Sequence, residues 1–544
     1  MRRWNGWGDD TVTHDVPEAA RAKLAEWIGP ATAPVDATLD EVMNQVQPSR
    51  LPDHPLVVTE PLERVRHARG QSLPDWLALR SGQIEAFPDG VAFPTDDEQV
   101  SALLEYTQKS GAEIIPYGGG TSVVGHINPR PGGRPVLTVN MGRLNRLRTF
   151  DHKSLQATFG AGVAGPDLEA QLRAHDCTLG HFPQSFEYST LGGWVATRSS
   201  GQQSLGYGRI EDLFVGGRVE SPGGLLRLPA TFPASAAGPD LRQLVLGSEG
   251  RLGLITEVTV RASPLPERED FHAVFFPDFE SGREATRLLM QTGVPLSMLR
   301  LSTGRETETT LILAGHKLLI GTLERLLSLR GVSEQKAMLL FGISGREQLA
   351  RSARKEALAI TGEHGGVHVG RTFGNEWHKG RFHTPYLRNT LWELGYAVDT
   401  LETATSWEQV PEMITAIEEA LIPGLEAEGE RVHAFTHLSH FYKNGCSIYT
   451  TYLFRLAPDP ATTLRHWQRL KEAASKAIVG LGGTISHQHG VGVDHAPYLQ
   501  AEKGVLGTGL LAAALDYFDP EGMMNPGKLV GRSGIIAQDE FGPT

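Results

Sequence analysis

A glycine-rich turn is the first group of residues in this 544-residue chain whose types and spacing suggest chemistry. The run Pro116-Tyr117-Gly118-Gly119-Gly120-Thr121-Ser122 follows a short apolar strand predicted over residues 112–116, with no helix pattern directly behind it. Three consecutive glycines allow positive φ angles and let several backbone N–H groups approach one anion. The turn matches neither the G-x-G-x-x-G pattern nor a P-loop, so a phosphate cradle and a plain glycine-rich turn both stay open.

Five side chains of the second half have the types that bind anions or move protons. Arg300 stands in an apolar strand pattern, where an unpaired cation is costly, so it is either a site residue or one half of a buried ion pair. Arg388 carries a planar guanidinium, which suits bidentate capture of a phosphate or carboxylate. Tyr449 lies in a β pattern. His487 and His489 are predicted on one face of a strand, as proton carriers, metal ligands or hydrogen-bonded structural residues.

A second glycine pattern, over residues 160–165, formally matches G-x-G-x-x-G between a predicted strand at 154–159 and a predicted helix at 166–175. We interpret it as a structural turn, because Pro166 and Asp167 should start the helix after the third glycine. In the dinucleotide fingerprint the glycines themselves open the helix, and a second βαβ unit with a ribose-binding acid follows.

The elements that must position these groups begin with a βαβ rhythm near residue 90. A strand is predicted at 91–93, then Thr95 as an N-cap and an amphipathic helix over 96–110, which delivers the chain into the strand before the glycine turn. A further strand is predicted at 135–140. The preceding residues 1–85 read as a helical, proline-punctuated segment, with its best helix at 17–28. The loop Trp4-Asn5-Gly6-Trp7-Gly8 is expected to pack on a domain surface.

Residues 181–202 are unusually dense in hydroxyls and glycines, which suits a surface that wraps a long polar ligand. A further glycine turn at 247–253 precedes a strand predicted at 254–260, and Pro264-Leu265-Pro266 marks a linker. Beyond it, strands and helices alternate. They are predicted at 271–276, 280–292, 334–343, 346–364 and, as a long helix, 462–481. Tyr452 is predicted to be a core aromatic on the strand face opposite Tyr449.

Composition narrows the class of protein. An apolar content of 40%, 62 glycines and a net charge of −12 without a basic block describe a turn-rich globular enzyme of two or three domains and argue against a nucleic-acid partner. The two cysteines, Cys177 and Cys446, are too few for a disulfide framework, which favours a reducing compartment. No signal peptide or spanning segment is expected, so we predict a cytoplasmic protein, with a peripheral membrane contact left open.

The glycine turn, the hydroxyl-rich segment and the second glycine turn, in this order, resemble the flavin domain of the vanillyl-alcohol oxidase, or FAD-linked oxidase, superfamily. More narrowly, the chain resembles alkyl-dihydroxyacetonephosphate synthase and its bacterial relatives. The blocks that carry this resemblance span nearly the whole chain and lie at residues 4–8, 185–200, 247–253, 401–407 and 486–492.

The resemblance implies an α+β fold in which a two-subdomain PCMH-type FAD-binding domain is followed by a cap, or substrate, domain with an antiparallel sheet. Its expected boundaries are a helical N-terminal segment at 1–85, the FAD-binding domain at 86–265, the cap at 266–500 and a C-terminal segment at 501–544 that returns to the FAD domain. It also implies non-covalently bound FAD. The implied FAD contacts are Pro116, Tyr117, Gly118, Gly119, Gly120, Thr121, Ser122, Gln184, Ser185, Ser189, Thr190, Gly193, Thr197, Ser199, Ser200, Glu249, Gly250, Leu252, Gly253 and Ile255.

For catalysis, the resemblance implies that Arg388 binds the substrate's phosphate, that Tyr449 is the catalytic phenol, and that His487 and His489 belong to the site with Arg300 in support. Related flavin-dependent dehydrogenases that use a metal carry a Gly-Asp-Gly-Asn-x-His block. The corresponding residues 444–449 of this chain hold no carboxylate and no histidine, so no metal site is expected.

Two features depart from the synthase pattern. The synthase has three histidines in a row, whereas Gln488 is the middle residue here, and an amide cannot transfer a proton. The ending Asn525-Pro526-Gly527-Lys528 is more like that of the FAD-linked dehydrogenases.

The leading hypothesis is an FAD-dependent synthase-like enzyme of ether lipid synthesis. It would exchange the acyl group of acyl-dihydroxyacetone phosphate for a fatty alcohol through a flavin N5 adduct. The alternative is an FAD-linked dehydrogenase or oxidase of a D-2-hydroxy acid or glycerol phosphate. Either substrate carries a phosphate or carboxylate, and the resemblance implies a homodimer.

Overall fold

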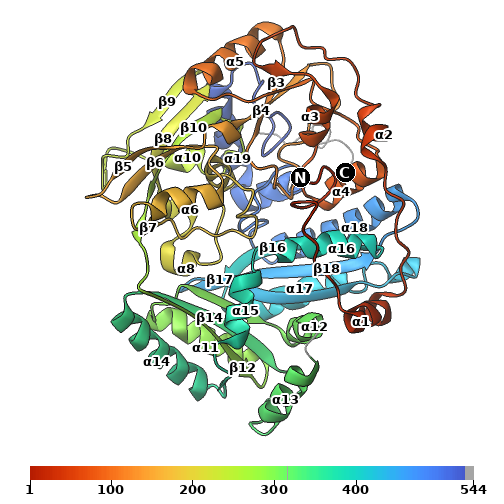
Figure 1. Ribbon diagram of the computed structural model, residues 1–544, viewed down its shortest axis with the longest axis vertical. Coiled ribbons are helices and arrows are strands. Elements are labelled where there is room, and N and C mark those ends of the chain that lie inside the picture. Colours follow the sequence, from red (N-terminus) through yellow and green to blue (C-terminus); the bar gives the residue numbers. More distant parts are fainter. Residues whose placement is uncertain (315–316, 533–544) are drawn as a thin grey trace.

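The computed structural model describes residues 1–314 and 317–532. Three larger sheets and one two-stranded sheet are surrounded by helices (Figure 1). Two of the larger sheets fill the upper part of the view, and a seven-stranded sheet fills the lower part. This architecture confirms the predicted α+β fold with an antiparallel sheet in its second half.

The first sheet presents the glycine turn at the end of its edge strand β3. Its strand order is β1 (Val57–Val58), β2 (Gly90–Ala92), β4 (Val136–Asn140), β3 (Glu113–Tyr117), with β2, β4 and β3 parallel. Helix α5 (Asp97–Ser110) connects β2 to β3. The expectation that Thr95 caps this helix is wrong by one residue: the Asp96 carboxylate accepts a hydrogen bond from Gln99 N at 2.8 Å and is the N-cap.

The second sheet is antiparallel throughout. Its order is β5 (Leu147–Asp151), β6 (Gln156–Gly160), β10 (Leu254–Arg261), β8 (Phe214–Ser221), β9 (Gly224–Leu228). Helix α6 (Gly165–Arg173) begins at the third glycine of the 160–165 pattern, so our argument that it starts after that glycine is wrong. The antiparallel neighbours of β6 nevertheless rule out a parallel βαβ unit at this turn.

The third sheet is fully antiparallel. Its order is β15 (Val367–His368), β12 (Arg268–Phe276), β14 (Ala337–Gly345), β13 (Met298–Ser302), β17 (His433–Phe441), β18 (Gly445–Arg455), β16 (Tyr396–Ser406). Helices α11 (Phe279–Thr292), α14 (Glu347–Glu363), α17 (Val410–Leu421) and α18 (Pro460–Gly480) contribute side chains to the large core on one face.

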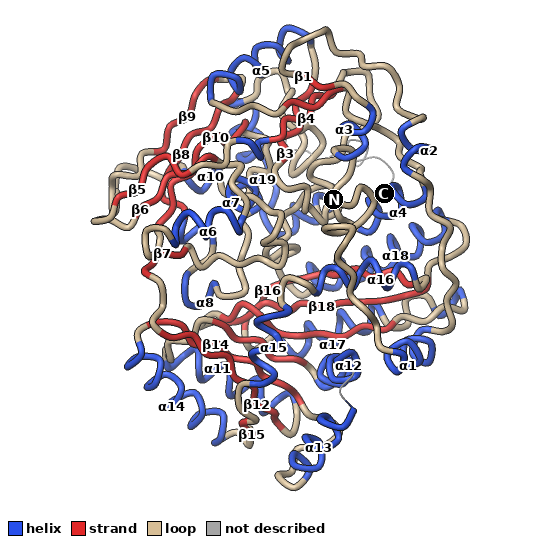
Figure 2. Tube along the Cα trace, in the orientation of Figure 1, coloured by secondary structure: helices blue, strands red, loops and turns tan. Residues whose placement is uncertain are grey.

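On the other face of this sheet, α12 (Gly304–Ala314), α13 (Lys317–Ser328) and α15 (Thr372–Gly380) pack over β12, β14 and β13. The part formed by β17, β18 and β16 lies on the side of the first and second sheets (Figure 2). Helix α16 (Leu387–Glu393) packs against the edge strand β16. The candidate site lies between these strands and the first two sheets.

Both ends of the described chain pack against distant segments. After α19 (Leu499–Phe518), Met524 forms a β-bridge with Ile114 of β3. At the other end, Trp7 is only 7% exposed and belongs to the large core, so the expectation that it packs on a surface is wrong. The N-terminal helices are α1 (Glu18–Ile28), α2 (Leu39–Met43), α3 (Pro61–Arg66) and α4 (Leu73–Ser81). No described helix is long and apolar enough to cross a membrane.

Candidate active site

The glycine turn after β3 leaves no room for side chains. A Cβ atom on Gly118 would lie 2.3 Å from Thr190 Oγ1, and one on Gly119 would lie 1.8 Å from Tyr188 O. Gly120 has a φ angle of +66°. Within the described chain, no acceptor receives a hydrogen bond from the backbone N–H groups of residues 119–122. The turn therefore offers free donors beside the 188–190 segment, and this arrangement fits a pyrophosphate.

The hydroxyl-rich segment forms the wall opposite this turn. Thr190 is the N-cap of α7 (Leu191–Thr197), and its hydroxyl accepts a hydrogen bond from Gly193 N at 3.3 Å. The Thr197 hydroxyl donates to Gly193 O within the same helix. Ser189 accepts from an indole N–H at 2.8 Å. Gln184 is exposed, so of the implied contacts in this segment it is the one the fold does not enclose.

Two serines after α7 reach histidines on either side of them. The Ser199 hydroxyl contacts His181 Nε2 at 2.8 Å, and the Ser200 hydroxyl contacts His440 Nδ1 at 3.0 Å. His440 has a φ angle of 47° at a register shift between β17 and β18. This bulge turns its ring toward the first half of the chain. Burial lowers the pKa values of His181 and His440 to about 3, so both rings are neutral near pH 7.

The second glycine turn faces the first through Gly250, which packs on Pro116. Glu249, at a φ angle of 53°, directs its buried carboxylate to the backbone N–H groups of Val491 and Gly492, at 2.5 and 2.8 Å. This carboxylate therefore holds the histidine segment. Of the other implied contacts here, Leu252 and Ile255 are buried in the core of the second sheet, and Gly253 packs against the backbone of β8.

Tyr449 lies in a row of side chains that crosses three strands. It is in register with His437 of β17 on one side and with Glu402 of β16 on the other, so the three side chains share one face. The ring centroids of Tyr449 and His437 are 5.0 Å apart and nearly parallel. Burial raises the pKa of Tyr449, so its phenol stays protonated.

The segment that carries the histidines is a loop and not the predicted strand. One buried oxygen of Glu402 accepts hydrogen bonds from the backbone N–H groups of Gln488 and His489, at 2.6 and 2.7 Å. The loop is thus clamped by two carboxylates, Glu402 from the seven-stranded sheet and Glu249 from the first half of the chain. The His489 ring meets the Tyr449 ring edge-on, with centroids 5.9 Å apart. Burial lowers the pKa of His489.

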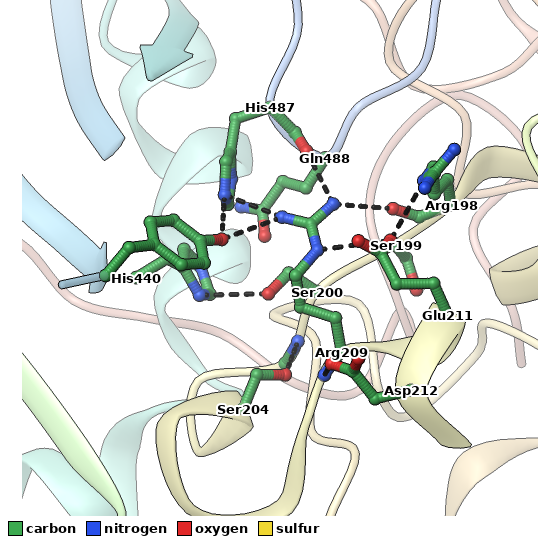
Figure 3. Close-up of polar contacts among 12 residues, drawn as sticks. Arg198, Ser199, Ser200, Ser204, Arg209, Glu211, Asp212, His440, His487 and Gln488 are labelled. Atoms are coloured by element: carbon green, nitrogen blue, oxygen red, sulfur yellow. Dashed lines mark hydrogen bonds and ion pairs between the residues drawn. The ribbon is translucent and has the colours of Figure 1, made fainter. Parts of the chain in front are cut away.

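His487 points to a different neighbour, Arg209 (Figure 3). Its Nε2 atom lies 2.6 Å from both Arg209 Nη1 and the Tyr442 hydroxyl, and Arg209 Nη2 also donates to the His487 carbonyl at 3.0 Å. A guanidinium only donates hydrogen bonds, so Nε2 must be the acceptor and the proton of the neutral ring sits on Nδ1. Burial lowers the pKa of His487, in agreement with a neutral ring.

Arg300 forms an ion pair with buried Glu306 and contacts His437 Nδ1 at 3.3 Å. Glu306 also lies 3.0 Å from that nitrogen. Burial alone would raise the pKa of Glu306, but His437 and Arg300 lower it to about 2. Arg300 therefore contacts His437, whose ring stacks on Tyr449, and the Arg300 charge opposes the effect of burial on the pKa of Tyr449.

Arg388, on α16, is the predicted site residue that has no anionic partner. Its guanidinium stacks on Trp76 at 4.4 Å from the ring centroid and donates to Gln71 O at 2.5 Å. Its Nη2 atom is buried without a hydrogen-bond partner, and no described carboxylate pairs with it. Tyr449 and Asp399 lie close enough to influence its pKa, which burial lowers. The arrangement leaves one guanidinium edge for an external anion.

Sequence reasoning missed several of these residues. Glu402 is 1% exposed, but it lies in a threonine-rich strand, so the apolar-pattern argument used for Arg300 does not find it. Arg209, Tyr442 and His440 gave no signal either, because only the tertiary fold brings them to the histidine loop. Asp494, whose pKa is raised by burial to about 7 and whose Oδ2 has no partner, was also missed.

Two family models match this chain, and together they define its class. The model described as the FAD binding domain matches residues 88–228, and the model described as the C-terminal domain of FAD linked oxidases matches residues 265–529. The free N–H groups and crowded glycines of the 118–122 turn fit a dinucleotide pyrophosphate independently of these matches. The protein is a FAD-dependent enzyme of the FAD-linked oxidase class.

Relatives narrow the class further. Alkyldihydroxyacetonephosphate synthase of Caenorhabditis elegans is 30% identical over 86% of this chain and 80% of its own length. The synthase of Trypanosoma brucei brucei is 28% identical over 97% of this chain and 92% of its own. A solved structure of alkyldihydroxyacetonephosphate synthase superimposes with a TM-score of 0.82 at 25% identity, covering 96% of this chain and 98% of that one. The chain belongs to the alkyldihydroxyacetonephosphate synthase-like family.

Proposed function

We propose that this enzyme exchanges the acyl group of an acyl-dihydroxyacetone phosphate for a fatty alcohol, a step that makes an ether lipid precursor. The observation that best supports this proposal is that Arg388 is buried with its Nη2 group unpaired. Tyr449 lies close enough to influence the pKa of this guanidinium. A phosphate bound there would place the attached three-carbon unit beside the phenol. The two relatives described above carry the name of this activity.

The chain's own residues would hold FAD from three sides. The backbone of residues 118–122 would bind its pyrophosphate, while the 188–190 segment and the turn at Gly250 would enclose it. When bound, FAD supplies a ring nitrogen that can exchange groups on the substrate carbon without net oxidation. Substrate binding, orientation and proton movement are left to the side chains.

Tyr449 and His489 are suited to opposite proton transfers. The raised pKa of Tyr449 keeps a proton on its phenol, and the lowered pKa of His489 keeps its imidazole free to accept one. Their rings are in contact, so a proton can pass between substrate oxygens that lie near both. His487, with Nε2 occupied by Arg209 and Tyr442, can only donate from Nδ1. We assign it an orienting role.

A second candidate is a dehydrogenase or oxidase of a D-2-hydroxy acid or glycerol phosphate. Gln488 favours it, because the family's central histidine is absent and an amide moves no proton. Arg388 would then hold the carboxylate or phosphate, and His489 would take the hydroxyl proton. The two candidates therefore share a site and differ in whether electrons leave the protein.

The deciding experiment uses the purified, FAD-loaded protein under anaerobic conditions. Palmitoyl-dihydroxyacetone phosphate is added to one sample, and D-2-hydroxy acids or glycerol 3-phosphate are added to others. The proposal expects bleaching of the visible flavin band by the acyl substrate alone, with fatty acid released and no electrons passed to a dye acceptor. Bleaching by a hydroxy substrate, reversed by the dye, would establish the dehydrogenase instead.

The homodimer implied by the resemblance, and the peripheral membrane contact that the sequence leaves open, also belong to this proposal. Analytical ultracentrifugation tests the first, and flotation with lipid vesicles tests the second. A monomeric sedimentation coefficient at micromolar concentration would remove the dimer from it.

A further inference from the structure

The block Trp4-Asn5-Gly6-Trp7-Gly8 has no part in the site as described so far, yet it lies against it. We call residues 2–9 the N-terminal strap. Its first residue, Arg2, donates a hydrogen bond to Gly119 O in the glycine turn and stacks over Tyr188 at 5.2 Å. Its far end reaches α16, which carries Arg388. The strap therefore spans the distance between the turn proposed to hold FAD and the arginine proposed to hold substrate.

The strap contacts Asn389, directly after Arg388, and Tyr386, two positions before it. The Asn389 side chain accepts from Trp7 N at 3.1 Å and donates to Trp7 O at 3.0 Å, so both amide groups are used. The Tyr386 hydroxyl accepts from Asp9 N at 3.4 Å and lies 3.0 Å from the Tyr188 hydroxyl.

The two glycines of the block are explained by these contacts. A Cβ on Gly6 would lie 2.5 Å from Asn389 Oδ1. A Cβ on Gly8, which has a φ angle of +75°, would lie 2.3 Å from the Tyr386 ring. Any side chain at either position must push the strap away from α16. The strap can therefore approach this helix closely only with glycine at both positions.

A third contact leads from the strap to Arg388 itself. Gln71 Nε2 donates to Gly6 O at 3.4 Å, and Gln71 O accepts from Arg388. Gln71 Oε1 also accepts from the indole N–H of Trp76, on whose ring Arg388 stacks. The strap thus holds the helix turn around Arg388. It also holds Gln71, whose carbonyl accepts a hydrogen bond from the Arg388 guanidinium.

From these contacts we infer that the N-terminal strap is the positioning element of the substrate arginine: it holds the free edge of Arg388 at the place where the substrate anion binds. The inference rests on the proposed role of Arg388. A displaced guanidinium still carries its charge but no longer meets the anion in a fixed geometry, so anion affinity should fall more than the rate of chemistry.

The test compares Gly8→Ala with Gly429→Ala. Gly429 has nearly the same φ angle, +74°, but nothing lies within 4 Å of its added Cβ. Alanine at this control position is therefore strained in its backbone but meets no neighbouring atom. The probe is dihydroxyacetone phosphate, titrated into FAD-loaded protein and followed by the visible flavin spectrum. Gly8→Ala should weaken the probe's affinity roughly tenfold, with kcat within about twofold, while the control stays within about twofold in both. Arg388→Ala serves as the reference for complete loss of the anion contact.

Tyr386→Phe is the milder second variant, because it keeps the packed ring and removes only the hydroxyl that Asp9 and Tyr188 contact. It should weaken the probe's affinity about threefold at unchanged FAD content and unfolding temperature. If Arg388→Ala abolishes probe binding but Gly8→Ala and Tyr386→Phe bind like wild type, the strap inference is overturned and the proposed function stands. If Arg388→Ala binds the probe normally, the assignment of Arg388 fails and the strap's role fails with it.

Discussion

Glu402 uses one carboxylate oxygen to hold the loop that carries His489, and the same side chain stands beside Tyr449 in the cross-strand row. Replacing it by glutamine keeps the size but turns an acceptor of two N–H groups into an amide, part of which is itself a donor. We expect Glu402→Gln to lower kcat about 10- to 100-fold through misplacement of His489, with KM within about threefold.

Single-turnover flavin bleaching measures this rate directly. Glu408→Gln, a change of the same kind at an exposed position nearby, is the control and should leave the rate unchanged. A Glu402→Gln rate equal to that of the control would mean that the loop is held well enough by Glu249.

His489 also determines the expected pH dependence. Because burial lowers its pKa below the ordinary value of 6.5, the ring stays deprotonated, and able to accept a proton, in solutions more acidic than pH 6.5. The acid limb of the kcat/KM profile should therefore fall below pH 6.5 and should disappear in His489→Ala along with most of the activity. Steady-state rates in constant-ionic-strength buffers test this. An acid limb above pH 6.5 would assign the proton transfer to another group.

Among the elements, the glycine turn leaves very little room for a side chain. A Cβ on Gly119 would overlap Tyr188 O, so Gly119→Ala must separate the turn from the 188–190 segment. We expect this variant to be purified nearly free of FAD while its far-ultraviolet circular dichroism stays native. Gly133→Ala lies in the loop that follows the turn, has no atom within 4 Å of its added Cβ, and should keep the wild-type ratio of flavin to protein.

Most of the helices and strands for which local patterns gave bounds lie within one or two residues of those bounds, among them α1, α11 and α14, because amphipathic spacing is a local property. The histidine loop was mistaken for a strand, since alternation of two histidines says nothing about where their N–H groups bond. The backbone N–H groups of this loop bond to Glu402 and Glu249, which lie 86 to 243 positions away. The glycine turn could likewise be located from sequence, whereas the Arg209 contacts with His487 could not.

For the molecule as a whole, the buried neutral histidines make stability depend on pH. His181 and His440 have pKa values of about 3 in the fold, against 6.5 ordinarily, so below pH 6.5 the unfolded chain binds protons that the fold excludes. Their contribution to the free energy of unfolding is therefore fully present above pH 6.5 and is lost progressively as the pH falls toward 3. Each can cost up to about 1.4 kcal/mol per pH unit in that window.

Urea unfolding at pH 7.5, 6.5 and 5.5 measures this loss as a fall in the free energy of unfolding. His181→Asn, which removes one titrating ring, should flatten the dependence, whereas His152→Asn, at an exposed position, should leave it as in the wild type. A free energy that does not change below pH 6.5 would contradict the buried, neutral state of these rings.

The strap also sets an order of events during synthesis. Trp7 leaves the ribosome before its partner Asn389, which is 382 positions further along the chain. At about 5 to 20 residues per second, Trp7 waits for tens of seconds before the helix that receives it exists. The N-terminal strap must stay undocked for that time, so the anion site should be among the last parts of the molecule to form.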